Sequence, residues 1–334
     1  MAVADDLARV VTRAQSAARL DPREELFRTP SHLDGCALFL RYLPPTTRQV
    51  GEPKIVLYVH GATFPSALSI AHRFDGRSWR DELADAGFHV WGLDFLGFGA
   101  SDRYPEMAAS AEHHAPLGRA DSACRQLERA VRFICDWHRA PRISLIAHSW
   151  GTIAAGLFAG QFPELIERLV FFGPITWRPG KAAPASYPAW QCISLDDQWT
   201  RFTEDVPKRA APVLSQRHFA EWGELYLDTD PQSRTRKPAS VKTPSGPWQD
   251  VAAAWIGELG YDPGLIRAPL AILRGEWDNV TTDADARWLF DAATGSPIRR
   301  DVKISRATHL MHLEESRHQL YQEARCFLEG LEPH

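Results

Sequence analysis

Short apolar runs that alternate with helix-like segments are the feature that most constrains how this chain can fold. The runs are apolar throughout, which is typical of strands buried on both faces of a sheet. The segments between them place apolar residues at the spacing of an amphipathic helix. The sequence therefore predicts an α/β fold with a mostly parallel sheet flanked by helices. The expected strands are 36–42, 54–59, 88–93, 142–147, 169–172, 270–273 and 300–305, and the expected helices are 79–86, 122–138, 152–161, 283–293 and 315–331.

Length and charge narrow the class of protein further. A chain of 334 residues suits either two domains or one large α/β domain with an insertion. The formal net charge of −4 and a pI of about 6.4 argue against general nucleic-acid binding, which needs a basic surface. No run approaches the roughly 20 apolar residues of a membrane span, and the first 20 residues lack the apolar core of a secretory signal.

Cysteine spacing gives an expectation about compartment and metals. The five cysteines are odd in number, widely spaced and form no Cys-x-x-Cys motif, so neither a zinc site nor a disulfide framework is expected. We therefore expect a soluble, cytoplasmic protein with no metal, no cofactor, no nucleic-acid partner and no membrane association. The sequence gives no expectation about the oligomeric state.

The alternation of strands and helices breaks between residues 177 and 255. We interpret this stretch as a helical cap or lid inserted into the core, and its tryptophans as the wall of a substrate pocket or as the cap's own core. The predicted domains are an N-terminal helix and lead-in over 1–35, a core over 36–176 and 256–334, and the cap over 177–255. Half of the 12 tryptophans lie in the cap, namely Trp177, Trp190, Trp199, Trp222, Trp248 and Trp255.

One expected strand ends in a pattern that suits a nucleophile. Ala147, Ser149 and Gly151 form a small-x-Ser-x-small motif between a strand and an Ala-rich helix. A sharp turn at such a site pushes the Ser Oγ out of the sheet edge, and small flanking residues avoid collisions in so tight a turn. The N-terminus of the following helix favours negative charge that develops beside the nucleophile. Ser149 is the predicted nucleophile.

A second strand ends in His60, Gly61, Ala62 and Thr63. In α/β proteins with a nucleophile at such a turn, the loop after a second strand supplies one N–H group of an oxyanion hole, and the residue after the nucleophile supplies the other. We expect the amide of Ala62, with Thr63 as the alternative, to act together with the amide of Trp150. His60 is expected to support the loop by hydrogen bonding and not to act as a base.

The strand over 270–273 leads to a carboxylate that can orient a histidine. Asp278 is the predicted acid, because a carboxylate at this turn can stabilise an imidazolium. Glu276 and Asp283 are the alternatives, and each also suits a surface or helix-capping position.

The last strand leads to two histidines. His309 comes first and is the predicted base, whereas His312 is expected to pack beside the site or to cap a helix with Glu314. The order Ser149, Asp278, His309 is the nucleophile–acid–histidine order of the α/β-hydrolase fold. The interval between Ser149 and Asp278 also leaves room for the cap.

With these motifs in place, the chain resembles the α/β-hydrolase superfamily over residues 36–176 and 256–331. The loop from Asp94 to Ser101 resembles the Asp-x-x-Gly-x-Gly-x-Ser loop of that family, where its role is structural. The resemblance implies a catalytic triad of Ser149, Asp278 and His309.

Two departures from the family motifs, and the identity of the predicted nucleophile, narrow the activities that the resemblance implies. Ala147 stands where the family often has Gly, which is a small change. The His60-Gly-Ala-Thr-Phe segment differs from the His-Gly-Gly-Pro-Gly of prolyl aminopeptidases, which argues against peptidase activity although the Ser149 motif is similar to theirs. Dehalogenases and epoxide hydrolases of this fold use Asp as nucleophile, so the Ser at position 149 argues against both activities. Trp150 is interpreted as part of the pocket wall and as an amide donor.

The predicted activity is hydrolysis of a carboxylic ester or lactone through an acyl-enzyme, with a bulky or macrocyclic lactone as one option. The alternatives are an amide hydrolase similar to prolyl aminopeptidases and a non-catalytic binding protein on the same fold. The candidates for the substrate pocket are Thr63, Phe64, Trp177, Trp199 and Trp222.

Overall fold

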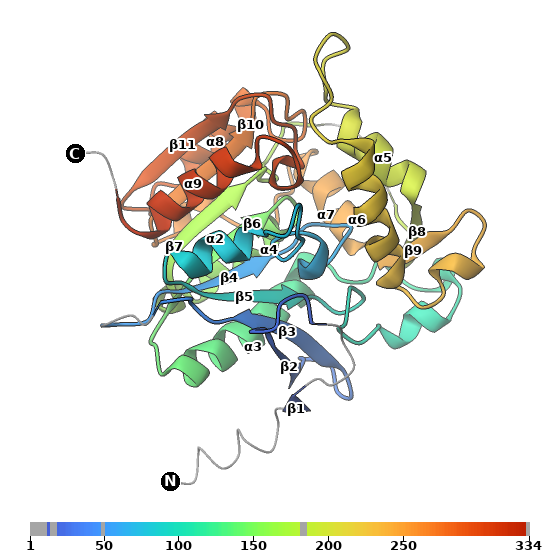
Figure 1. Ribbon diagram of the computed structural model, residues 1–334, viewed down its shortest axis with the longest axis horizontal. Helices are drawn as coiled ribbons and strands as arrows, with labels where there is room; N and C mark the ends of the chain where they lie inside the picture. The colour runs from blue at the N-terminus through green and yellow to red at the C-terminus, as the bar shows by residue number, and fades with distance from the viewer. Residues whose placement is uncertain (1–11, 14–18, 48–50, 181–185, 332–334) are drawn as a thin grey trace.

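A computed structural model describes residues 12–13, 19–47, 51–180 and 186–331. Within them, nine strands form one sheet in the order β1-β2-β3-β5-β4-β6-β7-β10-β11 (Figure 1). The strands are β1 (Thr12–Arg13), β2 (Glu25–Pro30), β3 (Ala37–Leu43), β4 (Ile55–Val59), β5 (His89–Asp94), β6 (Ile143–His148), β7 (Ile166–Phe172), β10 (Leu270–Gly275) and β11 (Arg299–Ile304).

The sheet is parallel from β5 to β11 in spatial order, and β1, β2 and β3 extend it as antiparallel strands at one edge. The prediction of a mostly parallel sheet flanked by helices is therefore confirmed. In a parallel sheet all carboxyl ends reach the same edge, so the loops that follow β4, β6 and β10 can meet there.

Strand β4 shows why these apolar runs form buried strands. All five of its residues are buried, and successive side chains point to opposite faces of the sheet. Leu57 and Val59 join the core on one face, whereas Val56 and Tyr58 join the core on the other. A strand whose two faces are both buried needs an apolar residue at nearly every position, which is the pattern of this sequence.

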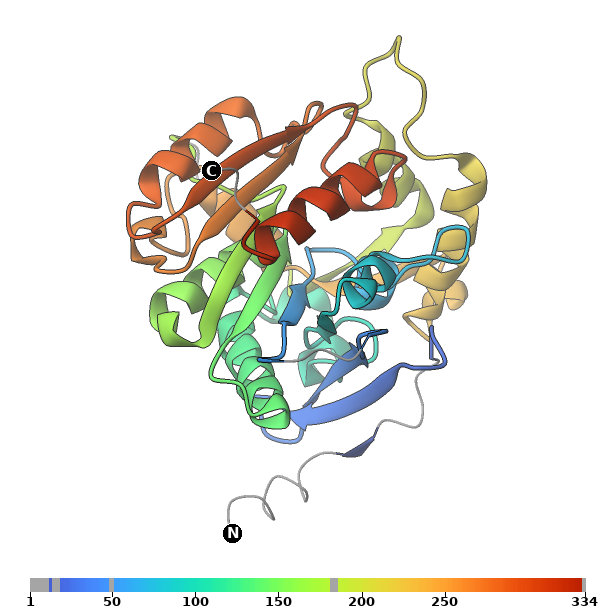
Figure 2. The ribbon, with the colours of Figure 1, turned by 60° about the vertical axis from the view of Figure 1, so that its left-hand side comes forward.

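Helices cover both faces of the sheet (Figure 2). Helices α2 and α9 pack on one face, where Trp79 and Tyr321 stack with ring centroids 4.7 Å apart. Helices α3, α4 and α8 pack on the other face, against the larger core. Their bounds are α2 (Trp79–Asp85), α3 (Ala120–His138), α4 (Gly151–Gln161), α8 (Asp283–Ala292) and α9 (Arg317–Leu328).

The predicted N-terminal helix and lead-in over residues 1–35 differ from the structure. Most of the predicted helix lies outside the described residues, but the lead-in contains strand β2. Strand β2 pairs antiparallel with β3 and places Phe27 against Trp91, with centroids 5.3 Å apart. Pairing with a neighbouring strand and burial of Phe27 determine the structure here, and neither is visible as a local period.

The described part of the segment between β7 and β10 contains three α-helices, but the prediction of a helical cap did not include its strands. It contains a two-stranded antiparallel sheet besides its helices, and Figure 1 shows these elements gathered on one side of the molecule. We call residues 186–255 the insertion. Its elements are β8 (Trp190–Ser194), α5 (Leu195–Thr203), α6 (Gln216–Asp228), β9 (Ser240–Pro244) and α7 (Gly246–Ala254).

The loop after β5 has the structural role that its motif implies. Asp94 accepts hydrogen bonds at Oδ1 from the Ser66 N–H, at 2.9 Å, and at Oδ2 from the Ala100 N–H, at 3.1 Å. Gly99 has φ +51°, and a Cβ there would lie 2.1 Å from Oδ2 of Asp94, so only glycine fits. The loop is thereby fixed against the segment that follows β4.

Candidate active site

The turn after β6 holds Ser149 in a strained conformation. Ser149 has φ +53°, a left-handed value that non-glycine residues rarely adopt. Its backbone N–H donates to the carbonyl of Phe172, at 3.2 Å, and its own carbonyl accepts from Oγ1 of Thr152, at 2.6 Å. A Cβ on Gly151 would lie 2.4 Å from the His60 carbonyl oxygen, so the small residue of the motif is required by β4.

Three side chains that the sequence singled out meet at the carboxyl edge of the sheet. Oγ of Ser149 lies 2.8 Å from Nε2 of His309. Nδ1 of His309 lies 3.2 and 3.1 Å from the two carboxylate oxygens of Asp278. Both carboxylate distances allow Nδ1–H to donate, which leaves Nε2 unprotonated and able to accept the hydroxyl proton of Ser149.

Asp278 is itself held by the turn in which it lies. Its Oδ1 accepts hydrogen bonds from the backbone N–H groups of Val280, at 2.9 Å, and Thr281, at 2.8 Å. A Cβ on Gly275 would lie 2.2 Å from the carbonyl oxygen of Ala307, so the end of β10 and the loop before His309 approach closely. This contact brings the acid and the histidine within hydrogen-bonding distance.

The alternative acids lie elsewhere. Glu276 is exposed and accepts the backbone N–H of Arg306, at 2.9 Å. Asp283 begins helix α8 and pairs with Arg274 and Lys303. Neither carboxylate contacts His309, so the geometry favours Asp278.

The loop after β4 is braced by His60, which is fully buried. Its Nε2 accepts the backbone N–H of Phe95, at 3.1 Å, so Nδ1 carries the proton and donates to the Gly61 carbonyl, at 2.7 Å. Both ring nitrogens are used, which fits a supporting role. Among the described residues, the amide groups of Ala62, Thr63 and Trp150 have no hydrogen-bond acceptor.

Two further histidines surround His309 and stay neutral. The His148 ring centroid lies 5.0 Å from that of His309 and 4.7 Å from that of His312. Burial lowers the pKa of His148 well below its usual value and that of His312 to about 3. Two uncharged neighbours do not oppose an imidazolium on His309, whereas a protonated neighbour would.

His148 is a site residue that sequence reasoning missed. Its Nε2–H donates to the carbonyl oxygen of His309, at 3.0 Å, so the residue before Ser149 fixes the loop that carries His309. The position is the variable one in the small-x-Ser-x-small motif, and the motif alone gives no signal for it.

A narrow crevice lies beside Ser149 and is too tight to hold a water molecule. Ser149 lines this crevice, but Ser149 and His309 are only 6% and 5% exposed. The crevice is far smaller than the roughly 300–1,000 Å³ that ligand pockets commonly measure. Its lining consists of Gly61, Ala62, Thr63, Phe64, His148, Ser149, Arg201 and Leu310.

Of the predicted pocket residues, only Thr63 and Phe64 line this crevice. Trp222 packs behind Phe64, with centroids 5.2 Å apart, in a buried cluster of the insertion. Trp199 packs against Phe219, at 4.9 Å, and Trp177 stacks on Trp288 of α8, at 6.0 Å. These three tryptophans therefore build the insertion and its junction with the core and do not form the wall beside Ser149.

The side chain of Trp150 is also buried away from the crevice. Its indole N–H donates to Oδ2 of Asp250 in helix α7, at 2.9 Å, and its ring packs against Phe95. Oδ2 of Asp250 also accepts the backbone N–H of Ala120, at 2.7 Å, and Oδ1 pairs with Arg119. The interpretation of Trp150 as pocket wall is wrong, because this buried acceptor draws the indole into the core.

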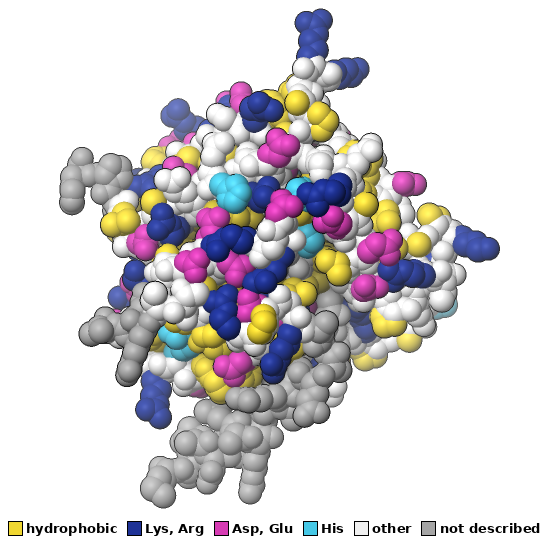
Figure 3. Space-filling view, in the orientation of Figure 1, with side chains coloured by type: hydrophobic (Ala, Val, Ile, Leu, Met, Phe, Trp, Pro, Cys, Tyr) yellow, Lys and Arg dark blue, Asp and Glu magenta, His cyan; other side chains and the backbone are white. Residues whose placement is uncertain are grey.

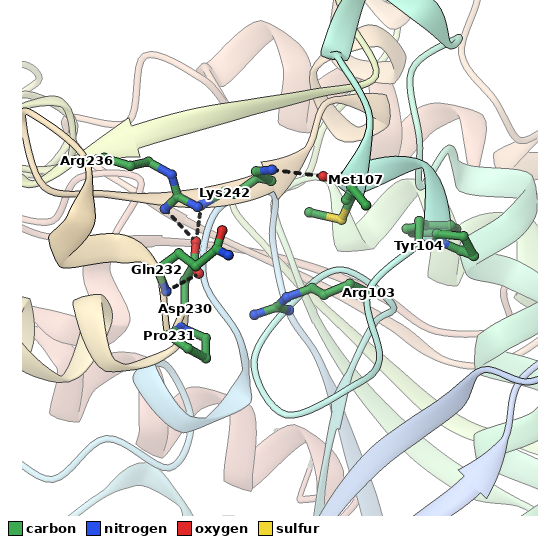
Figure 4. A pocket seen from close by; sticks show the side chains of 10 residues that line it. Arg103, Tyr104, Met107, Asp230, Pro231, Gln232, Arg236 and Lys242 are labelled. Carbon is green, nitrogen blue, oxygen red and sulfur yellow. Dashed lines mark hydrogen bonds and ion pairs between the residues drawn. The ribbon is translucent and has the colours of Figure 1, made fainter.

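A larger cavity of about 430 Å³ lies between the loop after β5 and the insertion (Figure 4). Asp230 accepts hydrogen bonds from the Arg236 guanidinium, at 2.7 Å, and from the backbone N–H of Lys242, at 3.0 Å. Nζ of Lys242 donates to the Met107 carbonyl, at 2.8 Å. This cavity holds no nucleophile paired with a base, and its contacts join the insertion to the core.

The described residues give no helix long and apolar enough to cross a membrane and no group of three or more His, Cys, Asp or Glu side chains suited to a metal. On the face seen in Figure 3, basic and acidic side chains are interspersed.

The parallel sheet, the strained turn at Ser149 and the Ser149–His309–Asp278 array define a class of α/β proteins that carry a nucleophile at the carboxyl end of a central strand. The chain belongs to the alpha/beta hydrolase fold family, whose family model matches residues 54–316. The motif, the triad order and the family match thus agree on one fold.

Curated relatives match part of the chain. A stretch of 150 residues is 28% identical to lipase member N of Mus musculus and covers 44% of this chain and 37% of that protein. A stretch of 147 residues is 24% identical to lysosomal acid lipase/cholesteryl ester hydrolase of Homo sapiens and covers 42% of this chain and 37% of that protein. The matches span little more than a third of these relatives' length.

Solved structures match over nearly the whole chain. An esterase from Thermogutta terrifontis superposes with a TM-score of 0.55 at 19% identity and covers 92% of this chain and 98% of its own. A serine hydrolase from Cycloclasticus zankles superposes with a TM-score of 0.58 at 13% identity and covers 92% of this chain and 99% of its own. At these identities the likeness concerns the fold.

Proposed function

We propose that this protein is a serine hydrolase that cleaves carboxylic esters through an acyl-enzyme. The observation that carries the proposal is the 2.8 Å contact between Ser149 Oγ and His309 Nε2, with Asp278 on the other ring nitrogen. A Ser paired with an oriented imidazole is the arrangement that activates a hydroxyl for attack on a carbonyl. The lipase and esterase names among the relatives support the same chemistry.

In the first half-reaction, Nε2 of His309 takes the hydroxyl proton as Ser149 Oγ attacks the ester carbonyl. The free amide groups of Ala62 or Thr63 and of Trp150 donate hydrogen bonds to the oxyanion. The imidazolium, stabilised by Asp278, then gives its proton to the leaving alcohol. The C–O bond breaks, and the acyl group remains on Ser149.

In the second half-reaction, His309 takes a proton from water as the water attacks the acyl-enzyme. Collapse of the second tetrahedral intermediate returns the proton to Ser149 and releases the acid. No proton or electron is left over, and no cofactor is needed for this sequence. A lactone would follow the same steps and release one hydroxy acid.

The experiment that tests the proposal is labelling with a fluorophosphonate, analysed by intact mass and peptide mapping. We expect one adduct on Ser149, and no adduct in the Ser149→Ala or His309→Ala variants. Turnover of a short neutral ester such as methyl pentanoate should fall by about 10³-fold or more in Ser149→Ala. An unlabelled, folded wild-type protein, or a Ser149→Ala variant with undiminished turnover, would contradict the proposal.

Two matched variants test the assignment of the acid. Asp278→Asn should lower the labelling rate by about 10³-fold or more, because an amide cannot hold Nδ1–H and stabilise the imidazolium. Glu276→Gln removes an exposed carboxylate from the same loop and should label at the wild-type rate. Comparison of an ester with the corresponding anilide then separates esterase from amidase activity.

A further inference from the structure

Arg201 brings a positive charge to the crevice beside the proposed nucleophile. It extends from helix α5 of the insertion and lines the same crevice as Ser149 and Ala62. It is the only charged side chain in that lining, because burial keeps His148 neutral. The insertion therefore contributes one cation to a site whose other parts come from the core.

The Arg201 guanidinium has donors without acceptors. Its Nε and Nη1 atoms are buried and have no hydrogen-bond partner among the described residues. The buried Arg41 and Arg80 contact Glu24, and the partly exposed Arg178 contacts Asp285. Arg201 forms no ion pair with a described carboxylate, so its charge lacks the counterion that these three arginines have.

The surroundings of Arg201 hold the guanidinium in place and bury two of its three nitrogen atoms. Its Cζ atom lies 4.8 Å from the centroid of the Trp248 ring, so a cation–π contact holds the guanidinium against this indole. The indole N–H of Trp248 is likewise buried without a partner among the described residues. Burial lowers the pKa of Arg201. Unpaired buried donors need an acceptor, and an anion at Arg201 satisfies both hydrogen bonding and charge.

We propose that Arg201 binds a carboxylate on the substrate, so that the site prefers short esters bearing an acid group near the scissile bond. This inference rests on the proposed ester hydrolase function. A planar carboxylate matches the guanidinium and carries the one negative charge that this side chain can neutralise. A phosphate dianion would bring a second charge, for which the crevice lining has no further cation.

The test compares two pairs of esters that differ only in a carboxylate. Monomethyl glutarate and methyl pentanoate place the difference on the acyl side, and 4-acetoxybenzoate and 4-methylphenyl acetate place it on the alcohol side. The measured quantity is the ratio of kcat/KM for the acidic ester to that for its neutral partner. We expect this ratio to exceed ~10 for at least one pair in the wild-type protein, because hydrogen bonds to charged groups contribute roughly 1.5–3 kcal/mol.

Substitution of Arg201 assigns the preference to this side chain. Arg201→Gln should lower the ratio by about tenfold or more, to near one or below, and Arg201→Lys should give an intermediate ratio because it keeps the charge but loses the planar pair of donors. Arg217→Gln, an exposed arginine of helix α6 in the same insertion, is the matched control and should leave the ratio unchanged. Circular dichroism confirms that each variant is folded.

Two outcomes separate failure of this inference from failure of the proposed function. Two results would show that the carboxylate site is wrong while the hydrolase function stands, provided that Ser149 is labelled. In the first, the wild-type ratio is near one; in the second, neither Arg201 variant changes the ratio. If Ser149 is not labelled, monomethyl glutarate and 4-acetoxybenzoate are titrated calorimetrically into the wild-type and Arg201→Gln proteins. Binding that weakens by about 10²-fold in the variant supports the anion site, and equal or undetectable binding overturns it.

Discussion

At the scale of single residues, Glu314 shows how the site is stabilised from behind. This carboxyl is fully buried and accepts hydrogen bonds from the backbone N–H of Thr308, at 3.0 Å, and from its hydroxyl. It thereby fixes the residue that precedes His309. Burial raises the pKa of Glu314 to about 7, so the carboxyl holds a proton in the folded protein at pH values where it is ionised in the unfolded chain.

The raised pKa predicts a pH-dependent stability. Between about pH 4.5 and 7 the folded state binds the proton and the unfolded state does not, so the free energy of unfolding falls as the pH rises. The full cost, on the order of 3 kcal/mol, is reached above pH 7. Glu314→Gln mimics the protonated carboxyl and should stabilise the protein at pH 8.5 but much less at pH 5, as measured by urea unfolding at both values.

The neighbouring Glu315 provides the control for this prediction. Its side chain is exposed, so Glu315→Gln should change the free energy of unfolding by less than about 0.5 kcal/mol at either pH. If Glu314→Gln shows the same difference from wild type at pH 5 and pH 8.5, the titration does not belong to Glu314.

At the scale of elements, the junction of β6 and α4 depends on the absence of one methyl group. A Cβ on Gly151 would lie 2.4 Å from the His60 carbonyl oxygen and 3.0 Å from that of Val59. Gly151→Ala should push α4 away from β4, lower the free energy of unfolding by about 1–3 kcal/mol and slow fluorophosphonate labelling of Ser149 by more than about tenfold.

Gly160 near the other end of α4 is the matched control. A Cβ there would approach only the Leu265 side chain, which is exposed, at 3.3 Å. Gly160→Ala should leave labelling unchanged and keep or slightly raise stability, because Ala favours the helix interior by roughly 0.5–1 kcal/mol. Equal labelling rates in both variants would show that α4 moves without affecting Ser149.

The elements also show where sequence patterns suffice. Strand β4 and helix α3 were predicted to within two residues, because burial on two faces or one leaves a clear period in the sequence. Strand β2 was missed, since its place at the antiparallel edge depends on pairing with β3. The two strands of the insertion pair only with each other, and a short run such as β8 carries no period that distinguishes it.

At the scale of the whole molecule, Asp250 ties the insertion to the core. Its carboxylate accepts hydrogen bonds from the indole of Trp150, the backbone N–H of Ala120 and the guanidinium of Arg119. The contact joins helix α7 to the residue after the proposed nucleophile and to the start of helix α3. The insertion is therefore fastened at the same turn that it covers.

Asp250→Ala should leave these donors without an acceptor and lower the free energy of unfolding by about 2–4 kcal/mol. Amide hydrogen exchange should accelerate in α7 and at the start of α3, because the shared carboxylate no longer links them. Asp228→Ala, which removes an exposed acid of helix α6, should change stability by at most about 0.5 kcal/mol. Unchanged exchange in α7 would show that other contacts hold the insertion.

The sequence by itself determined the parallel part of the sheet, its covering helices and the residues at the ends of its strands. It did so because burial leaves a local period, and because parallel strands carry their loops to one edge. Only the tertiary structure decided that His148 braces the His309 loop, that Asp250 withdraws the Trp150 indole, and that Arg201 reaches Ser149. These contacts join segments far apart in the chain, and their geometry follows from how the insertion packs on the core, which no local pattern encodes.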